Sequence, residues 1–354
     1  MAQAFSDRAS SLRCARARER PLMQSGWLFP AVAQLLLFLL VAGMAGSVDT
    51  GILKERFRRP RGIILGLCCQ FLILPLAGFA AAWACDLDAV YGFALLCVTS
   101  SPGGAYSNWW CSLFNADLAL SIAMTTCSTI VSVVMTPANL LLYGRLSYGT
   151  VPSLSWPRLL MSIGVCVVSI GVGLCVSTLF PERRRSFNVC GNVAGLVLIT
   201  LSLAVSSRDD PIWNKDASFY VAVGFPCVLG LVLSFGVGSA MPHISGPEAV
   251  ACAVETSYQN TGLALTIALA TFEEEQRGRA AGVPLYYGAC QIVLLPLFLL
   301  FSWRMGLTYA PKSARIDRVI REDFQPRSSS SPASSPASSP CASPPTSVPP
   351  TVIV

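Results

Sequence analysis

A helix break inside an apolar stretch constrains this chain more than any other feature of its sequence. Residues 100–137 read SSPGGAYSNWWCSLFNADLALSIAMTTCSTIVSVVMTP, so Pro102, Gly103 and Gly104 interrupt a run of membrane-like composition. In hydrocarbon an unpaired backbone group costs several kcal/mol, so a break is tolerated only where protein or a wet cavity satisfies it. Broken helices at membrane depth are typical of ion or substrate sites in secondary transporters.

The composition is that of a membrane protein. Hydrophobic residues make up 53% of the chain and charged residues only 12%, whereas soluble domains carry roughly 25% charged residues. Many apolar runs approach the ~20 residues that a bilayer requires, which excludes a soluble enzyme with a large core. The 14 Cys lie mostly in apolar runs without CxxC spacing, so we expect reduced thiols and no structural zinc site.

The apolar runs predict about nine membrane-spanning helices. Their expected ranges are 27–47, 62–84, 89–111, 118–143, 158–180, 188–206, 217–240, 248–272 and 281–303. We therefore expect an all-α polytopic membrane protein whose transmembrane domain covers residues 27–306. The third and eighth ranges are too polar to be ordinary lipid-facing helices.

The short loops predict the orientation, because cytoplasmic loops carry an excess of Lys and Arg. The segments after the first, fifth and ninth spans are basic, and the loops between them on the other side are acidic. This pattern places the C-terminus in the cytoplasm and the N-terminus outside. The basic residues are Lys54, Arg56, Arg58, Arg59, Arg61, Arg183, Arg184, Arg185, Arg304, Lys312, Arg315, Arg318 and Arg321; the acidic ones are Asp86, Asp88, Asp209, Asp210, Asp216, Glu273, Glu274 and Glu275.

Both ends of the chain lie outside the predicted membrane-spanning helices. Residues 1–26 are Arg-rich, and three interpretations stay open: a tolerated external tail, an organellar transit peptide or a misassigned start. Residues 307–354 are predicted to form a cytoplasmic Ser/Pro-rich disordered tail, because the composition of 327–350 cannot bury a core. The final TVIV suits a PDZ-type groove, although an inert tail is the simpler interpretation.

A carboxylate and several neutral oxygen ligands lie at membrane depth. Glu255 is well inside the eighth span, with Gln259 one turn further on, and no Lys or Arg lies at comparable depth. Glu255 must therefore stay protonated or hold a cation. Ser121 and Thr125 share one helix face, where they serve either as ligands or as packing contacts between helices. A set of oxygen ligands suits a hard cation such as Na⁺, with proton binding at Glu255 as the rival.

The order of the spans indicates two inverted repeats. One helix follows the broken third span and one helix follows the broken eighth span. Spans one to four and five to nine thus form two copies, the first of which lacks its opening helix. An odd number of helices separates the starts of the copies, so their topologies are opposite. Crossing unwound segments from such repeats meet near the bilayer midplane.

Four motifs resemble the sodium/bile-acid cotransporter family, including its bacterial homologues. They are Ser101–Pro–Gly–Gly–x–x–Ser–Asn108, Asp117–Leu–x–Leu–Ser–Ile–x–Met–Thr–Thr–Cys–Ser–Thr129, Gln70–Phe–x–x–x–Pro75–Leu and Glu255–x–x–x–Gln259–Asn260. With the hydropathy pattern, the resemblance covers about residues 27–310. It implies two crossing discontinuous helices, in a core domain of spans two to four and seven to nine. This core moves against a panel domain of spans one, five and six.

The resemblance also implies two sodium sites that share one carboxylate. The first would use Ser107, Asn108, Ser121, Thr125 and Glu255; the second would use Gln70, Glu255 and Gln259 with the backbone carbonyls of Thr256 and Tyr258. No transition metal is expected.

The break itself is predicted to take part in substrate binding. A half-helix that begins near Ser107 would present its N–H groups to an anion, and Gly103 and Gly104 would allow backbone shapes closed to other residues. The candidate substrate residues are Gly103, Gly104, Ala105 and Asn260. The chain departs from the bile-acid-carrying members, which have Asn-Leu where Ala105 and Tyr106 stand, and the bulky Trp109 and Trp110 follow.

These features predict a Na⁺-coupled symporter of an organic anion, working by alternating access. Its substrate would be a bile acid, a steroid sulfate or a smaller organic acid. The partners are the lipid bilayer, Na⁺ and the anion; we expect no other cofactor, no nucleic acid and no enzyme activity, since the spans hold no nucleophile–base pair. The plasma membrane is the expected location, with a plastid or mitochondrial membrane as the alternative. Two other functions stay open: a non-transporting sensor or scaffold, and proton coupling through Glu255.

Overall fold

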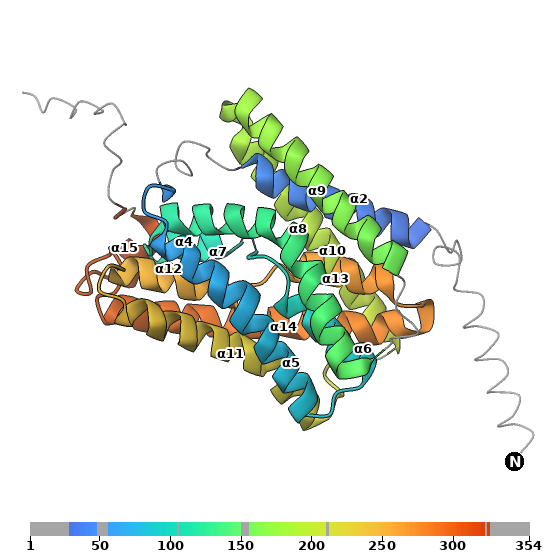
Figure 1. Cartoon of the computed structure of the whole chain (residues 1–354). Helices are drawn as coiled ribbons and strands as arrows, with labels where there is room; N and C mark the ends of the chain where they lie inside the picture. Colours follow the sequence, from blue (N-terminus) through green and yellow to red (C-terminus); the bar gives the residue numbers. More distant parts are fainter. Residues whose placement is uncertain are drawn as a thin grey trace, which may run out of the picture.

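The computed structural model describes residues 28–47, 56–104, 106–149, 156–209, 212–322 and 324–325, and these residues form helices without an extended strand (Figure 1). The α-helices are α2 (Leu28–Gly46), α4 (Arg61–Cys68), α5 (Leu74–Ala84), α6 (Ala89–Thr99), α7 (Tyr106–Leu113), α8 (Leu118–Tyr148), α9 (Trp156–Leu179), α10 (Arg184–Asp209), α11 (Ala217–Ala240), α12 (Gly246–Ser257), α13 (Thr261–Thr271), α14 (Glu274–Arg304) and α15 (Ile316–Arg321). A π-helical turn, Cys69–Ile73, joins α4 to α5, and a 3₁₀ turn, Pro181–Arg183, precedes α10.

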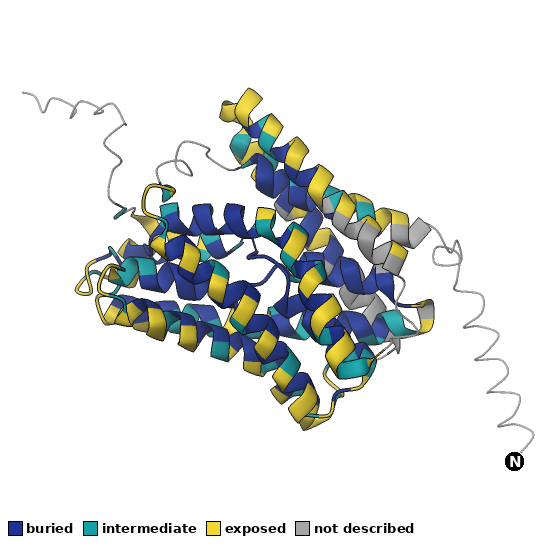
Figure 2. Cartoon of the chain, in the orientation of Figure 1, coloured by how far each residue is buried: buried dark blue, intermediate teal, exposed yellow. Residues whose placement is uncertain are grey.

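Several of these helices suit a bilayer. Four segments in the described part of the chain are long and apolar enough to cross a membrane, at 61–84, 118–148, 217–240 and 275–304, and shorter apolar helices cover 31–46, 89–99 and 167–179. Large apolar side chains such as Trp83, Val134 and Leu297 are exposed, and Figure 2 shows such exposed positions along the outer faces of α5, α8 and α11. Apolar surface on this scale requires lipid contact. The chain is therefore an integral multi-pass membrane protein.

Two of the predicted spans are each divided into two helices. The third range is split into α6 and α7 around Pro102, and the eighth into α12 and α13 around Tyr258. Proline disfavours helical geometry in the residue before it, and Tyr258 leaves the helical region with φ −86° and ψ 92°. Asn260 then begins α13, because its side chain accepts the Leu263 amide at 3.0 Å. Several predicted spans were short: α8 continues to Tyr148, α10 covers Arg184–Asp209 and α14 starts at Glu274.

The helices separate into a smaller group and a larger body. α2 packs against both α9 and α10, and Figure 1 shows α2 and α9 together along one side of the molecule. α11 packs on α12 and α5, while α12 contacts α4 and α8. α13 and α14 extend from this larger body to α2 and α10. Of the two broken helices, α12–α13 reaches the smaller group through α13, whereas the main contacts of α6–α7 are with helices of the larger body.

Charged residues form ion pairs at the two ends of the helices. At the end predicted to face the cytoplasm, the Arg56 guanidinium binds both Asp117 carboxylate oxygens at 2.6 and 2.7 Å and Glu248 at 3.4 Å. At the opposite end, Arg279 binds Asp88 at 2.6 Å. Each pair joins loops that the sequence assigns to one side of the membrane. The Arg56–Asp117 pair is the more buried of the two, whereas Arg279 and Asp88 are exposed.

The segment of residues 307–322 and 324–325, here called the C-terminal segment, folds back on the core. Its helix α15 buries Val319 completely. The Asn115 amide donates to the Val319 and Glu322 carbonyls at 3.0 and 3.3 Å, and its oxygen accepts the Phe324 amide at 2.8 Å. The expected start of a disordered tail at residue 307 was therefore wrong. Residues 1–26, and the rest of the predicted tail with its TVIV end, lie outside the described residues.

Tyr309 joins the C-terminal segment to the ion pair of Arg56. Burial raises the pKa of Tyr309, and the negative charge of Asp117 raises it further. The hydroxyl therefore stays protonated and donates to Asp117 at 3.2 Å. The Tyr309 amide also donates to the Asn115 carbonyl at 2.9 Å. These contacts attach the segment to the loop between α7 and α8.

Candidate functional site

The two helix breaks pair with each other. The Gly104 amide donates to the Tyr258 carbonyl, and the Asn260 amide donates to the Pro102 carbonyl, both at 2.9 Å. These bonds form an isolated antiparallel bridge between Gly103 and Gln259. Backbone that leaves a helix inside a membrane must find partners within the protein, and here each break supplies partners for the other. Main-chain hydrogen bonds alone therefore connect the two breaks at the crossing.

Close packing explains why glycine occupies the first break. A Cβ added to Gly103 would lie 2.7 Å from a Glu255 carboxylate oxygen. A Cβ added to Gly104 would lie 2.9 Å from the Tyr258 ring and 3.0 Å from the Gln259 carbonyl oxygen. Among the described residues, the glycines with left-handed φ are Gly149 and Gly306. The expected reason, a backbone shape closed to other residues, was therefore wrong; what these positions require is the absence of a side chain.

Glu255 lies at the centre of the crossing. It belongs to α12 and is fully buried. Hydroxyl groups from α7 and α8 donate to its carboxylate: Ser107 at 2.6 Å, Thr125 at 2.9 and 3.0 Å to the two oxygens, and Ser121 at short range. The Asn108 side-chain oxygen accepts from Ser121 at 2.8 Å and approaches Thr125 at 3.4 Å. The structure thus brings together all five residues of the first predicted set.

The electrostatics of this cluster are unusual. None of the ion pairs in the described part of the chain includes Glu255. Each hydroxyl carries one proton, yet Ser107 also faces the Gly104 carbonyl and Thr125 the Ser121 carbonyl. The oxygens therefore make more close contacts than their protons can satisfy. A group of oxygens around one carboxylate can hold a hard cation or a proton.

Of the second predicted set, Gln70 lies near the same carboxylate, and Gln259 is held by neighbouring residues of the two breaks. Gln70, in the π-helical turn, is buried, and its Nε2 atom has no hydrogen-bond partner. That atom lies 3.5 Å from the Cβ position of Gly103, next to Glu255. The buried Gln259 donates to the Thr256 carbonyl at 2.6 Å, and its side-chain oxygen lies 3.4 Å from the Ser101 hydroxyl. The Tyr258 carbonyl accepts from the Gly104 amide and has a second lone pair.

The predicted substrate residues that the structure describes, Gly103, Gly104 and Asn260, are buried. The amides of Gly103 and Gly104 already donate, to the Ser128 hydroxyl at 3.3 Å and to the Tyr258 carbonyl. An anion would therefore have to compete for them. The Asn260 side chain caps α13, and its amide lies 4.0 Å from the Met44 sulfur of α2. Ala105 lies outside the described residues.

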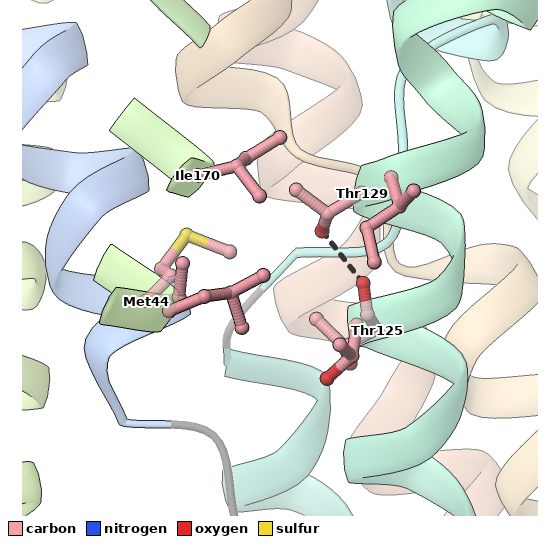
Figure 3. Close-up of a pocket in the computed structure, with 8 residues that line it drawn as sticks. Met44, Thr125, Thr129 and Ile170 are labelled. Carbon is pink, nitrogen blue, oxygen red and sulfur yellow. Dashed lines mark hydrogen bonds between the residues drawn. The ribbon is translucent and has the colours of Figure 1, made fainter. Parts of the chain in front are cut away.

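A narrow cavity separates α8 from α2 and α9. Figure 3 shows Met44 and Ile170 on one side, with Thr125 and Thr129 on the other. The cavity volume is about 20 Å³, enough for a water molecule and too small for an organic anion. Its walls are Met44, Ala45, Thr125, Thr126, Thr129, Ile130, Ile170 and Leu174. It reaches Thr125, so one wall of the cavity is also part of the oxygen cluster.

Sequence reasoning missed the side chains that support the crossing. A row of buried polar side chains extends from Thr125 along one face of α8. It consists of Ser128, Ser132, Thr136 and Asn139. Thr136 binds the Ser100 carbonyl at 2.6 Å, and Asn139 binds the Phe71 carbonyl of the π-helical turn at 3.0 Å. Their spacing of three and four residues, in an otherwise apolar helix, is the signal that would have found them.

Comparison with known proteins shows which sequences this chain is similar to. The family model described as "Sodium Bile acid symporter family" matches residues 34–215. An ileal sodium/bile acid cotransporter from Oryctolagus cuniculus is 30% identical over 276 residues, which are 76% of this chain and 78% of that protein. The protein of the same name from Homo sapiens is 28% identical over 306 residues, 84% and 86% of the two chains. A sodium-dependent organic anion transporter from Homo sapiens is 29% identical over 271 residues, 75% and 71%. Because the family model matches more than half of its length, and because relatives align across most of the rest, this chain belongs to the sodium bile acid symporter family.

Proposed function

We propose that this protein couples the inward movement of Na⁺ to the uptake of an organic anion. The observation that carries the proposal is Glu255, a fully buried carboxylate that accepts from hydroxyl groups, two of which also lie next to the Asn108 amide oxygen. A cation at this position would satisfy the charge that no described basic residue balances. The names of the relatives, sodium/bile acid cotransporter and sodium-dependent organic anion transporter, support the same function.

The donor set fits two Na⁺ ions that share Glu255. Ser107, Asn108, Ser121 and Thr125 would hold the first ion with one carboxylate oxygen. The second ion would use Gln70 and Gln259 with the carbonyls of Thr256 and Tyr258. Turning over the amide of Gln70, whose nitrogen is unpaired, presents an oxygen to this position. Oxygen ligands of this kind suit Na⁺ and not a transition metal.

Transport requires the cavity beside α8 to open. We propose that α2, α9 and α10 form a panel and that the remaining long helices form a core, with the anion bound between them. The cavity between α8 and α2 with α9 supports this division. Its small volume supports a conformation in which the anion site is closed. Movement of the panel would admit the anion next to Thr125 and Asn260, close to both ions. The plasma membrane is the proposed location.

Uptake into proteoliposomes tests the function directly. The purified protein would be supplied with an inward Na⁺ gradient and with a bile acid, a steroid sulfate or a small carboxylic acid as separate probes. We expect uptake of at least one class with Na⁺ outside, and none when K⁺ replaces Na⁺ at the same pH. The matched variant is Glu255→Gln, which keeps the size of the side chain and removes its charge. It should insert normally and lose nearly all uptake.

Other outcomes separate the competing functions. Full uptake without Na⁺, driven by a pH gradient, would replace sodium coupling with proton coupling through Glu255. Saturable binding of an anion without any uptake would indicate a sensor that keeps the fold. If Glu255→Gln retained more than about half of wild-type uptake at saturating Na⁺, the carboxylate would not be the shared ion ligand.

A further inference from the structure

Two buried side chains donate hydrogen bonds to the unwound backbone of the crossing. The Thr136 hydroxyl, on α8, donates to the Ser100 carbonyl at 2.6 Å. The Gln291 amide, on α14, donates to the Ser257 carbonyl at 3.2 Å and to the Gln259 carbonyl at 3.4 Å. Neither residue belongs to the proposed ion ligands. Both bind carbonyl groups that the helix breaks remove from helical hydrogen bonding.

The two contacts occupy equivalent places in the two halves of the chain. Each comes from the long helix that follows a broken helix: α8 follows α6–α7, and α14 follows α12–α13. Thr136 lies 36 residues after its carbonyl partner, and Gln291 lies 34 and 32 residues after its partners. In each half, a side chain of the following long helix donates to a carbonyl that the helix break leaves without a helical partner, although the two side chains differ.

Both contacts lead to one proposed ligand, Gln259. Gln291 binds the Gln259 carbonyl directly. Thr136 fixes Ser100, and the hydroxyl of the next residue, Ser101, lies 3.4 Å from the Gln259 side-chain oxygen. The position of Gln259 thus depends on contacts from α8, through Ser100 and Ser101, and from α14, through Gln291.

We propose that Thr136 and Gln291 are positioning residues that set the affinity of the second Na⁺ site without touching the ion. This inference rests on the proposed function. Thr136 and Gln291 are nearly fully buried, 3% and 1% exposed. Loss of either donor leaves a buried carbonyl that finds a new partner only if the segment shifts. A shifted segment must be returned to its original geometry when Na⁺ binds, so the ion binds more weakly.

The experiment compares two variants with two matched controls. Thr136→Val and Gln291→Met remove the donors and keep the approximate shape. Thr266→Val is the first control, because Thr266 is equally buried but binds the Gly262 carbonyl inside a continuous helix. Leu295→Met is the second, because it introduces methionine at a buried apolar position one turn along α14. Thr136→Ser keeps the hydroxyl and tests for rescue.

The measurements are the Na⁺ concentration for half-maximal uptake and the melting temperature of the purified protein with and without Na⁺. We expect the half-saturating Na⁺ concentration to rise about five-fold or more in Thr136→Val and in Gln291→Met, and to stay close to wild type in the controls and in Thr136→Ser. The Na⁺-induced rise in melting temperature should shrink in the same two variants.

Different failures have different meanings. If both variants melt at lower temperature but keep the wild-type Na⁺ requirement, the contacts are only structural and the inference is overturned. If the wild type itself shows no Na⁺-dependent uptake, the proposed function fails first, and this result is visible before any variant is compared. If Thr136→Val cannot be produced, Gln291→Met tests the same claim from the other half of the chain.

Discussion

At the scale of single residues, the hydrogen bonding of the site is limited because each hydroxyl has one proton and faces several acceptors. Thr125 faces both carboxylate oxygens of Glu255 and the side-chain oxygen of Asn108. A hydroxyl can donate to one of these at a time, and its lone pairs remain available to a cation. The same group can therefore stabilise the carboxylate when the ion is absent and bind the ion when it arrives.

Substitutions of Thr125 separate ion binding from packing. Thr125→Ala should raise the Na⁺ concentration for half-maximal uptake more than it lowers the maximal rate, because an oxygen ligand is lost. Thr125→Ser should have a mild effect, because the oxygen remains. The Na⁺ dependence of initial uptake rates measures both parameters. Equal behaviour of the alanine and serine variants would show that the methyl group, and hence helix packing, is what matters.

The glycines of the first break give a second prediction at this scale. Gly104→Val should reduce both Na⁺ binding and anion binding, because its side chain would meet the Tyr258 ring and the Gln259 carbonyl. Gly236→Val on α11 is the matched control, since no atom lies within 4 Å of its Cβ position. Binding of each ligand to purified protein would be measured separately. Loss of anion binding with normal Na⁺ binding would instead place the anion at the break itself.

At the scale of helices, the breaks were predictable and their support was not. Pro102 with Gly103 and Gly104 marks the first break in the sequence, and Glu255 with Gln259 marks the second. The π-helical turn at Gln70 has a weaker signal in Pro75, which has no N–H and so leaves the Phe71 carbonyl without its helical donor. The extra residue in that turn is stabilised by Asn139, which is far away in the sequence. Local sequence patterns report only weakly a backbone irregularity that depends on a distant side chain.

The C-terminal segment shows the same limit. Its sequence is polar enough to resemble the start of the tail, and only its fit against Asn115 and the buried Val319 reveals its role. A chain that ends at residue 325 should keep the uptake and the melting temperature of the full protein. A chain that ends at residue 306 should lose about 1–3 kcal/mol for each buried polar group left unpaired, chiefly at Asn115. Melting in detergent measures the difference, and equal melting of both truncations would contradict the prediction.

At the scale of the whole molecule, the proposed stoichiometry makes transport sensitive to voltage. Two Na⁺ that enter with one monovalent anion carry one net positive charge. A potential of about 100 mV then contributes about 2.3 kcal/mol to uptake, in addition to the Na⁺ gradient. An inside-negative potential, set with K⁺ and valinomycin, should accelerate uptake, and the Na⁺ dependence should be steeper than first order. Voltage-independent uptake with a simple hyperbolic Na⁺ curve would indicate one Na⁺ for each anion.

The pairing of the two breaks also has a consequence for how the protein is made. Ser101 and Gln259 are separated by 158 residues, and ribosomes add about 5–20 residues per second, so about 8–30 s pass between their synthesis. During that time the partners that the Pro102 carbonyl and the Gly104 amide have in the folded protein do not yet exist. Lipid cannot replace them. The first broken helix therefore reaches its final form only after the second has been made.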